Sequence, residues 1–338
     1  MVRNPKSPAG DERRIIVGVD LGGTTLGVGA MLADGSETFA MHTIATRANL
    51  GADAVVDRMT KLIEKVIAET CASTGRTRAD VLGVGIGSPG PLDREKGLVI
   101  FTPNLGWRDF PLRDRIRDAV KLPTSLDNDA NCATLGEWWL GAARGANHVV
   151  GLTIGTGIGG GLVLDRRLYH GASDVAAELG HTTIDTTGRR CKCGNYGCLE
   201  AYASGPAIAE RAREALAGGE PSRMPEMVGS DLSRITAALV FDAAKLGDAL
   251  AIEVVKETAR YLGAGVANML NIFNPDVVVL AGGVTQAGEA LFEPLRAEVR
   301  RRAFKPAVDV CRIVPGELKE RAGVVGAVAA FAQQHGLA

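Results

Sequence analysis

Long apolar runs are missing from this sequence. No stretch approaches the roughly 18 consecutive apolar residues that a membrane-spanning helix needs, and the polar, proline-containing start has no apolar segment of the secretory type. Neither sign of charge dominates, since the formal net charge is -1, so nothing electrostatic favours nucleic acid or an anionic membrane as the main partner. We expect a cytoplasmic protein that acts on a small neutral substrate, with no nucleic acid and no membrane as partner.

Aromatic residues are also scarce, at 4% of the chain, so the core must be built from aliphatic side chains. The hydrophobic content of 46% and the charged content of 23% are ordinary for a globular protein, which excludes disorder or a fibrous repeat for the chain as a whole. A chain of 338 residues is too long for one typical hydrophobic core. The sequence therefore predicts two domains.

Two stretches share one pattern, an apolar run, a glycine-rich turn and a second apolar run. They cover residues 13–35 and 148–167, and each predicts a β-hairpin. Two such hairpins indicate two halves built on one plan. Other patterns predict helices, a buried strand before Gly282-Gly283 and a surface loop rich in Gly, Pro and Ser. The helices are expected over 52–72, 112–120, 252–274, 287–302 and 323–334, further strands within the runs 81–90 and 275–284, and the loop over 217–232. This order of elements is typical of an α/β fold.

Cysteine is scarce too, with six in the chain, but three of the six lie close together. Cys191, Cys193 and Cys198 follow His181, and one imidazole with three thiolates is a closed ligand set of structural zinc. A disulfide would leave one of the three cysteines unpaired, and a reducing compartment disfavours disulfides. The C-x-C spacing also differs from the C-x-x-C of redox sites. The alternative is a group of inert cysteines. A closed set leaves no position for substrate, so the ion would hold loops and take no part in catalysis.

Glycine-rich turns are present without the usual nucleotide motifs. Both G-x-G-x-x-G matches lack the strand, turn and helix context of a dinucleotide site, and P-loop and protein-kinase motifs are missing. A glycine-rich hairpin turn can still direct several N–H groups at a phosphate, although a purely structural tight turn is the alternative. Two such turns in matched places favour a nucleotide. The predicted nucleotide-binding residues are Asp20, Gly22, Gly23, Thr24, Thr156, Gly157, Gly282 and Gly283.

Several of these motifs together resemble the ROK family of sugar kinases and repressors. They are Asp20-Leu21-Gly22-Gly23-Thr24, Asn128-Asp129, Gly155-Thr156-Gly157, Glu178-Leu179-Gly180-His181 and the cysteine segment up to Glu200. The resemblance covers residues 15–330 and is most similar to the bacterial glucokinase branch, partly through the segment Pro103 to Trp107. It implies an actin-like, hexokinase-type ATPase fold, with two domains flanking a cleft and the last helix returning to the first domain. We expect the first domain to be 1–127 plus 323–338, with 1–14 as a flexible tail, and the second to be 128–322 with the zinc loop.

The resemblance also implies a reaction, the transfer of a phosphoryl group from ATP with Mg2+ to the 6-hydroxyl of glucose. Such a transfer needs a positioned hydroxyl, a proton acceptor and neutralised phosphate charge. It assigns the general base to Asp129 and an ion-orienting role to Asp20, although residues such as Asn128 and Asp129 also cap helices. One departure is Thr25, where many relatives carry a longer polar residue. The predicted sugar-binding residues are Asn104, Asn128, Asp129, Glu178, His181 and Glu200.

Other functions within the family stay open at this point. The sugar could be N-acetylmannosamine, N-acetylglucosamine or fructose, and the donor could be polyphosphate. A sugar-responsive repressor is a further alternative, but repressors of this family carry a helix-turn-helix module before the glycine hairpin, and only 14 residues precede Ile15. A nucleic-acid-binding zinc ribbon is disfavoured by the lack of a basic surface. The resemblance suggests a homodimer or homotetramer.

Overall fold

The structure, a computed structural model, describes residues 14–337, and this part of the chain divides into two compact units. Unit 1 is formed by the described residues up to Gly145, by Leu168–Ala176 and by the chain from Glu317 onward. Unit 2 is formed by Ala146–Arg167 and Ala177–Gly316. The flexible tail expected over 1–14 lies outside the described residues except for Arg14. Within 14–337, no helix is both long and apolar enough to cross a membrane.

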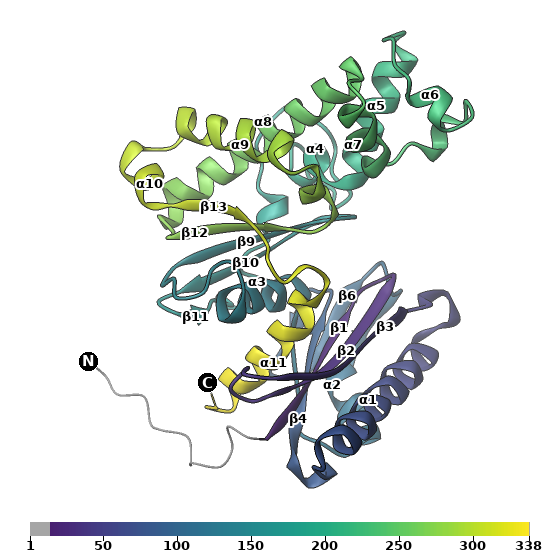
Figure 1. The fold of residues 1–338 in the computed structure, drawn as a ribbon, viewed down its shortest axis with the longest axis vertical. Helices are drawn as coiled ribbons and strands as arrows, with labels where there is room; N and C mark the ends of the chain where they lie inside the picture. The colour runs from purple at the N-terminus through teal and green to yellow at the C-terminus, as the bar shows by residue number, and fades with distance from the viewer. Residues whose placement is uncertain (1–13, 338) are drawn as a thin grey trace. The chain divides into compact units, whose positions relative to one another are not determined.

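Unit 1 is built on a five-stranded sheet with the order β3-β2-β1-β4-β8, in which β1, β4 and β8 are parallel (Figure 1). Its strands are β1 (Ile15–Leu21), β2 (Thr25–Leu32), β3 (Thr38–Ala45), β4 (Val81–Ser88) and β8 (Thr124–Asn128). A small second sheet holds β5 (Leu92–Asp93), β6 (Leu98–Thr102) and β7 (Trp107–Phe110). The helices are α1 (Ala52–Thr74), α2 (Leu112–Val120), α3 (Asp129–Leu140) and α11 (Ala322–Gln334), with single 3-10 turns at Ala48–Leu50, Arg78–Asp80 and Lys319–Arg321.

Both faces of the sheet are buried along β1, β2 and β4, which explains why these strands read as continuous apolar runs. Alternate residues of β1 point to opposite faces. Ile15 and Val17 pack with α1 and α2, whereas Ile16 packs with α11. Glycines let α11 lie directly on the sheet, because a Cβ at Gly18 or Gly85 would overlap backbone carbonyl oxygens of α11. The sheet is therefore a central layer between two layers of helices.

Unit 2 repeats the plan with a sheet of order β11-β10-β9-β12-β13. Its strands are β9 (Val149–Ile154), β10 (Ile158–Leu164), β11 (Arg167–Leu168), β12 (Val277–Ala281) and β13 (Arg312–Pro315). Its helices are α4 (Glu200–Ala203), α5 (Gly205–Ala217), α6 (Met224–Met227), α7 (Ala237–Lys245), α8 (Ala249–Phe273), α9 (Glu289–Arg302) and α10 (Lys305–Val310), with 3-10 turns η4 (Leu179–His181), η5 (Leu232–Arg234) and η6 (Gly283–Ala287). In both units an antiparallel hairpin precedes strands that pair in parallel. The two predicted hairpins and the α/β class are confirmed.

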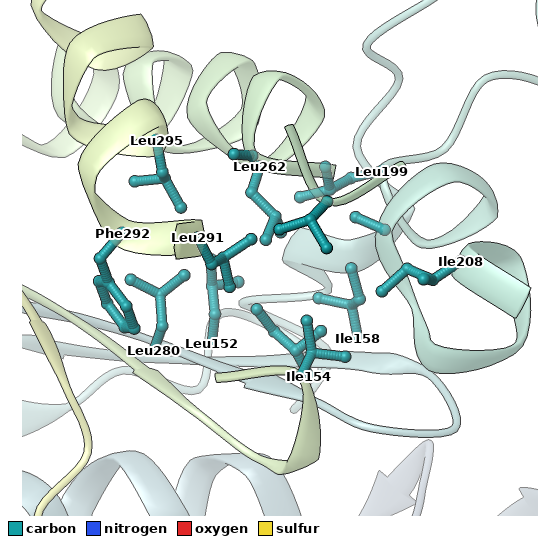
Figure 2. Close-up of a cluster of buried hydrophobic side chains, with 14 of the residues drawn as sticks. Leu152, Ile154, Ile158, Leu199, Ile208, Leu262, Leu280, Leu291, Phe292 and Leu295 are labelled. Carbon is teal, nitrogen blue, oxygen red and sulfur yellow. The ribbon is translucent and has the colours of Figure 1, made fainter. Parts of the chain in front are cut away.

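The core of unit 2 lies between its sheet and its helices (Figure 2). Leu152, Ile154 and Leu280 from the strands lie beneath Leu262 of α8 and Leu291 of α9. Branched aliphatic side chains dominate, as the low aromatic content predicted. This packing fixes the carboxyl end of β9 and the following glycine turn, which carry the predicted nucleotide-binding residues.

Three sequence expectations differ from the structure. The domain boundary expected after residue 127 falls after Gly145, because α3 packs against α11, where a Cβ at Gly326 would overlap the carbonyl oxygen of Cys132. The loop expected over 217–232 contains α6, anchored by the buried side chain of Met224. The helix expected from residue 287 begins at Glu289, after η6.

Candidate active site and metal centre

The turn between β1 and β2 carries the predicted phosphate-binding residues Gly22, Gly23 and Thr24. The N–H of Gly22 donates to the carbonyl oxygen of Thr25 at 2.8 Å and closes the turn. A Cβ at Gly23 would lie 2.9 Å from the Cβ of Asn104, so only glycine allows this close approach. The predicted sugar-binding Asn104 therefore lies beside the predicted phosphate-binding turn.

Asp20 lies one residue before the end of β1, and its carboxylate contacts Gly323 of α11, where any larger residue would collide with it. Burial, and second the negative charge of Asp129, raise the pKa of Asp20 from its ordinary value to about 7. The two carboxylates are thus close enough that ionisation of one disfavours ionisation of the other. A divalent cation would favour the ionised form of such a pair, so this donor set fits an ion bound with a nucleotide.

Asn128 and Asp129 lie where β8 passes into α3. Asn128 is the N-cap, and its Oδ1 accepts from the N–H groups of Ala130 and Asn131 at 2.9 and 3.1 Å. The oxygen of Asn128 therefore caps α3, which was the alternative interpretation of this residue. Its Nδ2 remains able to donate to a ligand. Asp129 is the first helical residue, and its Oδ1 also accepts from Ala130 N at 2.9 Å.

The buried carboxylate of Asp127, just before this pair, forms a cluster that the sequence did not reveal. Its Oδ2 lies 2.8 Å from Nε2 of His170 and 3.0 Å from Nε of Arg94. Burial raises the pKa of Asp127, but the hydrogen bond from His170 and the charges of His170 and Arg94 outweigh it and hold the pKa below its ordinary value. Asp127 is therefore ionised at neutral pH. No local pattern could have joined positions so far apart in the sequence.

The four predicted metal ligands are brought together in unit 2. One ligand atom from each of His181, Cys191, Cys193 and Cys198 lies within 4.8 Å of all the others, so the group could hold a metal ion. The Sγ atoms of Cys193 and Cys198 are 3.7 Å apart, and Sγ of Cys191 is 3.8 Å from Nδ1 of His181. Thiolates at about 2.3 Å from a tetrahedral zinc ion lie about 3.8 Å from one another. The spacing fits such an ion, and all six cysteines are free thiols.

Glu200 follows the cysteine segment as the first residue of α4. Its Oε2 accepts a hydrogen bond from the N–H of Ile158 at 2.8 Å, and its Oε1 lies 3.9 Å from Sγ of Cys191. A Cβ at Gly157 would lie 2.5 Å from Oε2. The carboxylate thus lies against the turn between β9 and β10, which carries Thr156 and Gly157.

Other predicted residues of unit 2 surround this turn and the metal group. Gly282 follows β12 and has a φ of 95°, a conformation that favours glycine, and a Cβ there would overlap the carbonyl oxygen of Ile154 at the end of β9. Gly283 begins η6, and a Cβ there would meet nothing within 4 Å. Glu178 is exposed, and its Oε2 lies 4.0 Å from Nε2 of His181.

The predicted sugar-binding residues thus fall into two groups. Asn104, Asn128 and Asp129 belong to unit 1, and Glu178, His181 and Glu200 belong to unit 2. Each group lies beside a glycine-rich hairpin turn of its own unit. Phosphoryl transfer to a sugar requires a carboxylate that can accept a proton, amides and carboxylates that can bind hydroxyls, and N–H groups that can bind an anion.

Comparison with known proteins agrees with this combination. Residues 16–334 match the model of the ROK family. A glucokinase of Thermotoga maritima is 39% identical over 322 residues, which cover 95% of this chain and 98% of the relative. A xylose repressor of Caldicellulosiruptor bescii is 34% identical over 273 residues, which cover 81% of this chain and 68% of the relative.

The fold is also similar to a solved enzyme of that family. The crystal structure of a ROK family glucokinase from Streptomyces griseus in complex with glucose and AMPPNP superposes with a TM-score of 0.79 at 34% identity. The match covers 95% of this chain and 99% of that chain.

Proposed function

This chain belongs to the ROK family, and on that premise we propose that it is an ATP-dependent hexokinase that phosphorylates glucose at the 6-hydroxyl. The observation that carries the proposal is the proximity of Asp129 to Asp20, since the charge of one carboxylate raises the pKa of the other. Asp20 lies near the end of β1 and Asp129 directly follows β8, and the carboxyl ends of these parallel strands meet at one edge of the sheet. A proton acceptor and a phosphate-binding turn therefore share that edge.

In this mechanism, Asp129 accepts the proton of the 6-hydroxyl as the sugar oxygen attacks phosphorus in line with the leaving group. Asn104 and Asn128 hold sugar hydroxyls, and the free amide nitrogen of Asn128 donates while its oxygen caps α3. Asp20 would hold Mg2+ through water, and this ion supplies neutralisation of phosphate charge when bound with ATP. Gly22, Gly23 and Thr24 surround phosphate with N–H and hydroxyl donors.

Unit 2 contributes the remaining contacts of the proposal. Thr156, Gly157, Gly282 and Gly283 bind the nucleotide, because their backbone leaves N–H groups accessible to an anion. Glu178, Glu200 and Nε2 of His181 bind sugar hydroxyls. Carboxylates accept from two neighbouring hydroxyls and so disfavour a sugar that lacks one of them.

The metal of the Cys3His group is zinc in this proposal. Its role is structural, because four protein ligands leave no open position. Nδ1 of His181 faces the group and Nε2 points away from it toward Glu178, so the ion orients a sugar-binding residue without touching substrate. Three thiolates require a reducing compartment, which agrees with a role in the cytoplasm.

A coupled assay for ADP release over a panel of sugars, with and without Mg2+, tests the function. Glucose should give the highest kcat/KM among glucose, N-acetylmannosamine, N-acetylglucosamine, mannose and fructose, and ATP should exceed polyphosphate as donor. Loss of activity on removal of Mg2+ is expected, because the triphosphate charge is then not neutralised. Preference for another sugar would keep the reaction and reject glucose as the substrate.

A sugar-responsive repressor is the second candidate, and the similarity to the xylose repressor favours it. The matched region covers 98% of the glucokinase but 68% of the repressor. Binding to a specific DNA site that survives about 0.2 M salt, in a chain without kinase activity, would favour the repressor. Kinase activity without such binding supports the enzyme.

We further propose that the chain forms a homodimer or homotetramer through the exposed face of α9. Ala290, Glu293, Ala297 and Arg300 all lie on this face, and Glu293 and Arg300 are about 10 Å apart along the helix axis. An antiparallel second copy centred between Arg296 and the small Ala297 would place each Glu293 opposite an Arg300, a self-complementary arrangement. Sedimentation should show weaker association for Glu293→Arg and for Arg300→Glu, and recovery in the double variant. Unchanged single variants would exclude this face.

A further inference from the structure

A short internal segment of the chain is tied to the strand end that presents the proposed base. Residues 168–176 belong to unit 1, although the residues on both sides of the segment belong to unit 2. His170 contacts Asp127, with 2.8 Å between Nε2 and Oδ2. Asp174 accepts a hydrogen bond from the backbone N–H of Arg94 at 3.1 Å, and the Arg94 side chain itself contacts Asp127.

The other oxygen of Asp127 holds the turn that leads to the base. Oδ1 accepts from the backbone N–H of Asn128 at 2.8 Å and from Nδ2 of Asn131 at 3.3 Å. Asn128 precedes Asp129, and Asn131 lies in the first turn of α3. One carboxylate therefore joins the segment 168–176 on one side to the backbone around Asp129 on the other.

The charges within this group decide which partners matter. Asp127 is 3% exposed, and a buried carboxylate is strongly destabilising unless it is paired. Because the carboxylate is ionised, it can only accept, so Nε2 of His170 carries the proton and donates. Arg94 supplies the positive charge. Without the donor of His170, Asp127 would keep Arg94 but lose the partner that fixes its orientation.

We propose that His170 and Arg94 are positioning residues for phosphoryl transfer, which hold Asp127 and, through it, the backbone that presents Asn128 and Asp129. This inference rests on the proposed function, since it assigns the base to Asp129. Neither residue touches substrate in this account. The effect should appear in kcat, because a displacement of about 1 Å at a reacting group costs about 100-fold in rate, whereas the turn at Gly22–Thr24, on a different strand, should bind ATP as before.

The test compares His170→Leu with His170→Gln in steady-state assays with the sugar that the wild-type chain phosphorylates best. The leucine variant removes the donor, and its kcat should fall by about 10- to 100-fold with little change in KM for ATP. The glutamine variant keeps an N–H at the ε position and should recover kcat to within about threefold of wild type. A matched control is His42→Leu, which removes a histidine–carboxylate contact of 2.6 Å, to Glu69, elsewhere in unit 1. Its kcat should stay unchanged.

A second readout separates this inference from the proposed function. Hydrogen exchange at the amide of Asn128 should be faster in His170→Leu and should return to the wild-type rate in His170→Gln. Equal kcat in wild type and His170→Leu, or equal loss in the leucine and glutamine variants, would overturn the positioning role. A wild-type chain that phosphorylates no sugar would refute the proposed function alone, and the exchange rate of Asn128 would then still decide whether His170 holds the turn.

Discussion

The carboxylate of Glu200 accepts a hydrogen bond from the backbone N–H of Ile158 at 2.8 Å. Glu200 follows the cysteines that could hold a metal ion, and Ile158 follows the Gly-Thr-Gly turn at 155–157. A residue proposed to bind sugar therefore also holds the turn proposed to bind the nucleotide. Its position against Gly157, where a Cβ would lie 2.5 Å from Oε2, requires the glycine at that place.

This contact predicts that Glu200→Ala impairs the use of both substrates. A lost charge-assisted hydrogen bond costs about 1.5–3 kcal/mol, so KM should rise about tenfold or more for glucose and also for ATP. Glu178→Ala is the matched control, because Glu178 is a proposed sugar ligand whose side-chain contact is to His181. It should raise KM for glucose alone. If Glu200→Ala left KM for ATP unchanged, the turn would not depend on Glu200.

Asp129→Asn should lower kcat by about 10³-fold or more, because the amide cannot accept the proton of the sugar hydroxyl. The amide oxygen can keep the hydrogen bond from Ala130, which is 2.9 Å long with aspartate, so the fold should be preserved. Calorimetry should show glucose binding close to that of wild type. Turnover near the wild-type rate would remove Asp129 from the role of base.

Cys193→Ser should reduce the zinc content of protein purified without chelator from near one ion per chain to a small fraction. Cys193 is the exposed cysteine of the group, so its replacement opens no cavity and any fall in Tm reports the lost ion. Each kcal/mol of lost stability should lower Tm by about 2–4 °C. Cys311→Ser, outside the group, should keep both metal and Tm. Unchanged metal content in Cys193→Ser would contradict the ligand assignment.

Asp20 should make the stability of the ligand-free protein depend on pH. The folded-state pKa of Asp20, about 7, exceeds its unfolded value. The contribution of Asp20 to folding stability is therefore fully present below about pH 4 and is lost as the pH rises through 7. The Asp20→Asn substitution removes the ionisable group and with it this loss of folding stability at high pH. The variant should therefore have a higher Tm than wild type at pH 8 and little advantage at pH 4, while losing kinase activity.

A surface carboxylate serves as the control for that prediction. Asp57 on α1 pairs with Lys61 at the surface, and Asp57→Asn should change stability by no more than about 0.5 kcal/mol at either pH. Parallel curves of Tm against pH for wild type and Asp20→Asn would show that the carboxylate of Asp20 is not perturbed by burial and by Asp129.

Local patterns predicted the parts of this protein that depend on neighbours in the chain. The helices α1, α2 and α11 and the two hairpins follow from apolar spacing and glycine turns, and the predicted bounds differ from the observed ones by few residues. The four side chains that could hold a metal ion were predicted because they lie within a short stretch of chain. The helix α6 was missed because its burial depends on one residue, Met224, in an otherwise polar segment.

The sequence was thus sufficient to predict the α/β class, the duplicated hairpin plan and the candidate functional residues, since each of these leaves a periodic or closely spaced signal. Only the tertiary structure revealed that α3 belongs with α11, that His170 and Arg94 reach Asp127, and that Glu200 holds Ile158. Such contacts join residues separated by tens of positions, and the energy that selects them comes from burial and charge pairing in the folded chain. Neither leaves a pattern along the sequence.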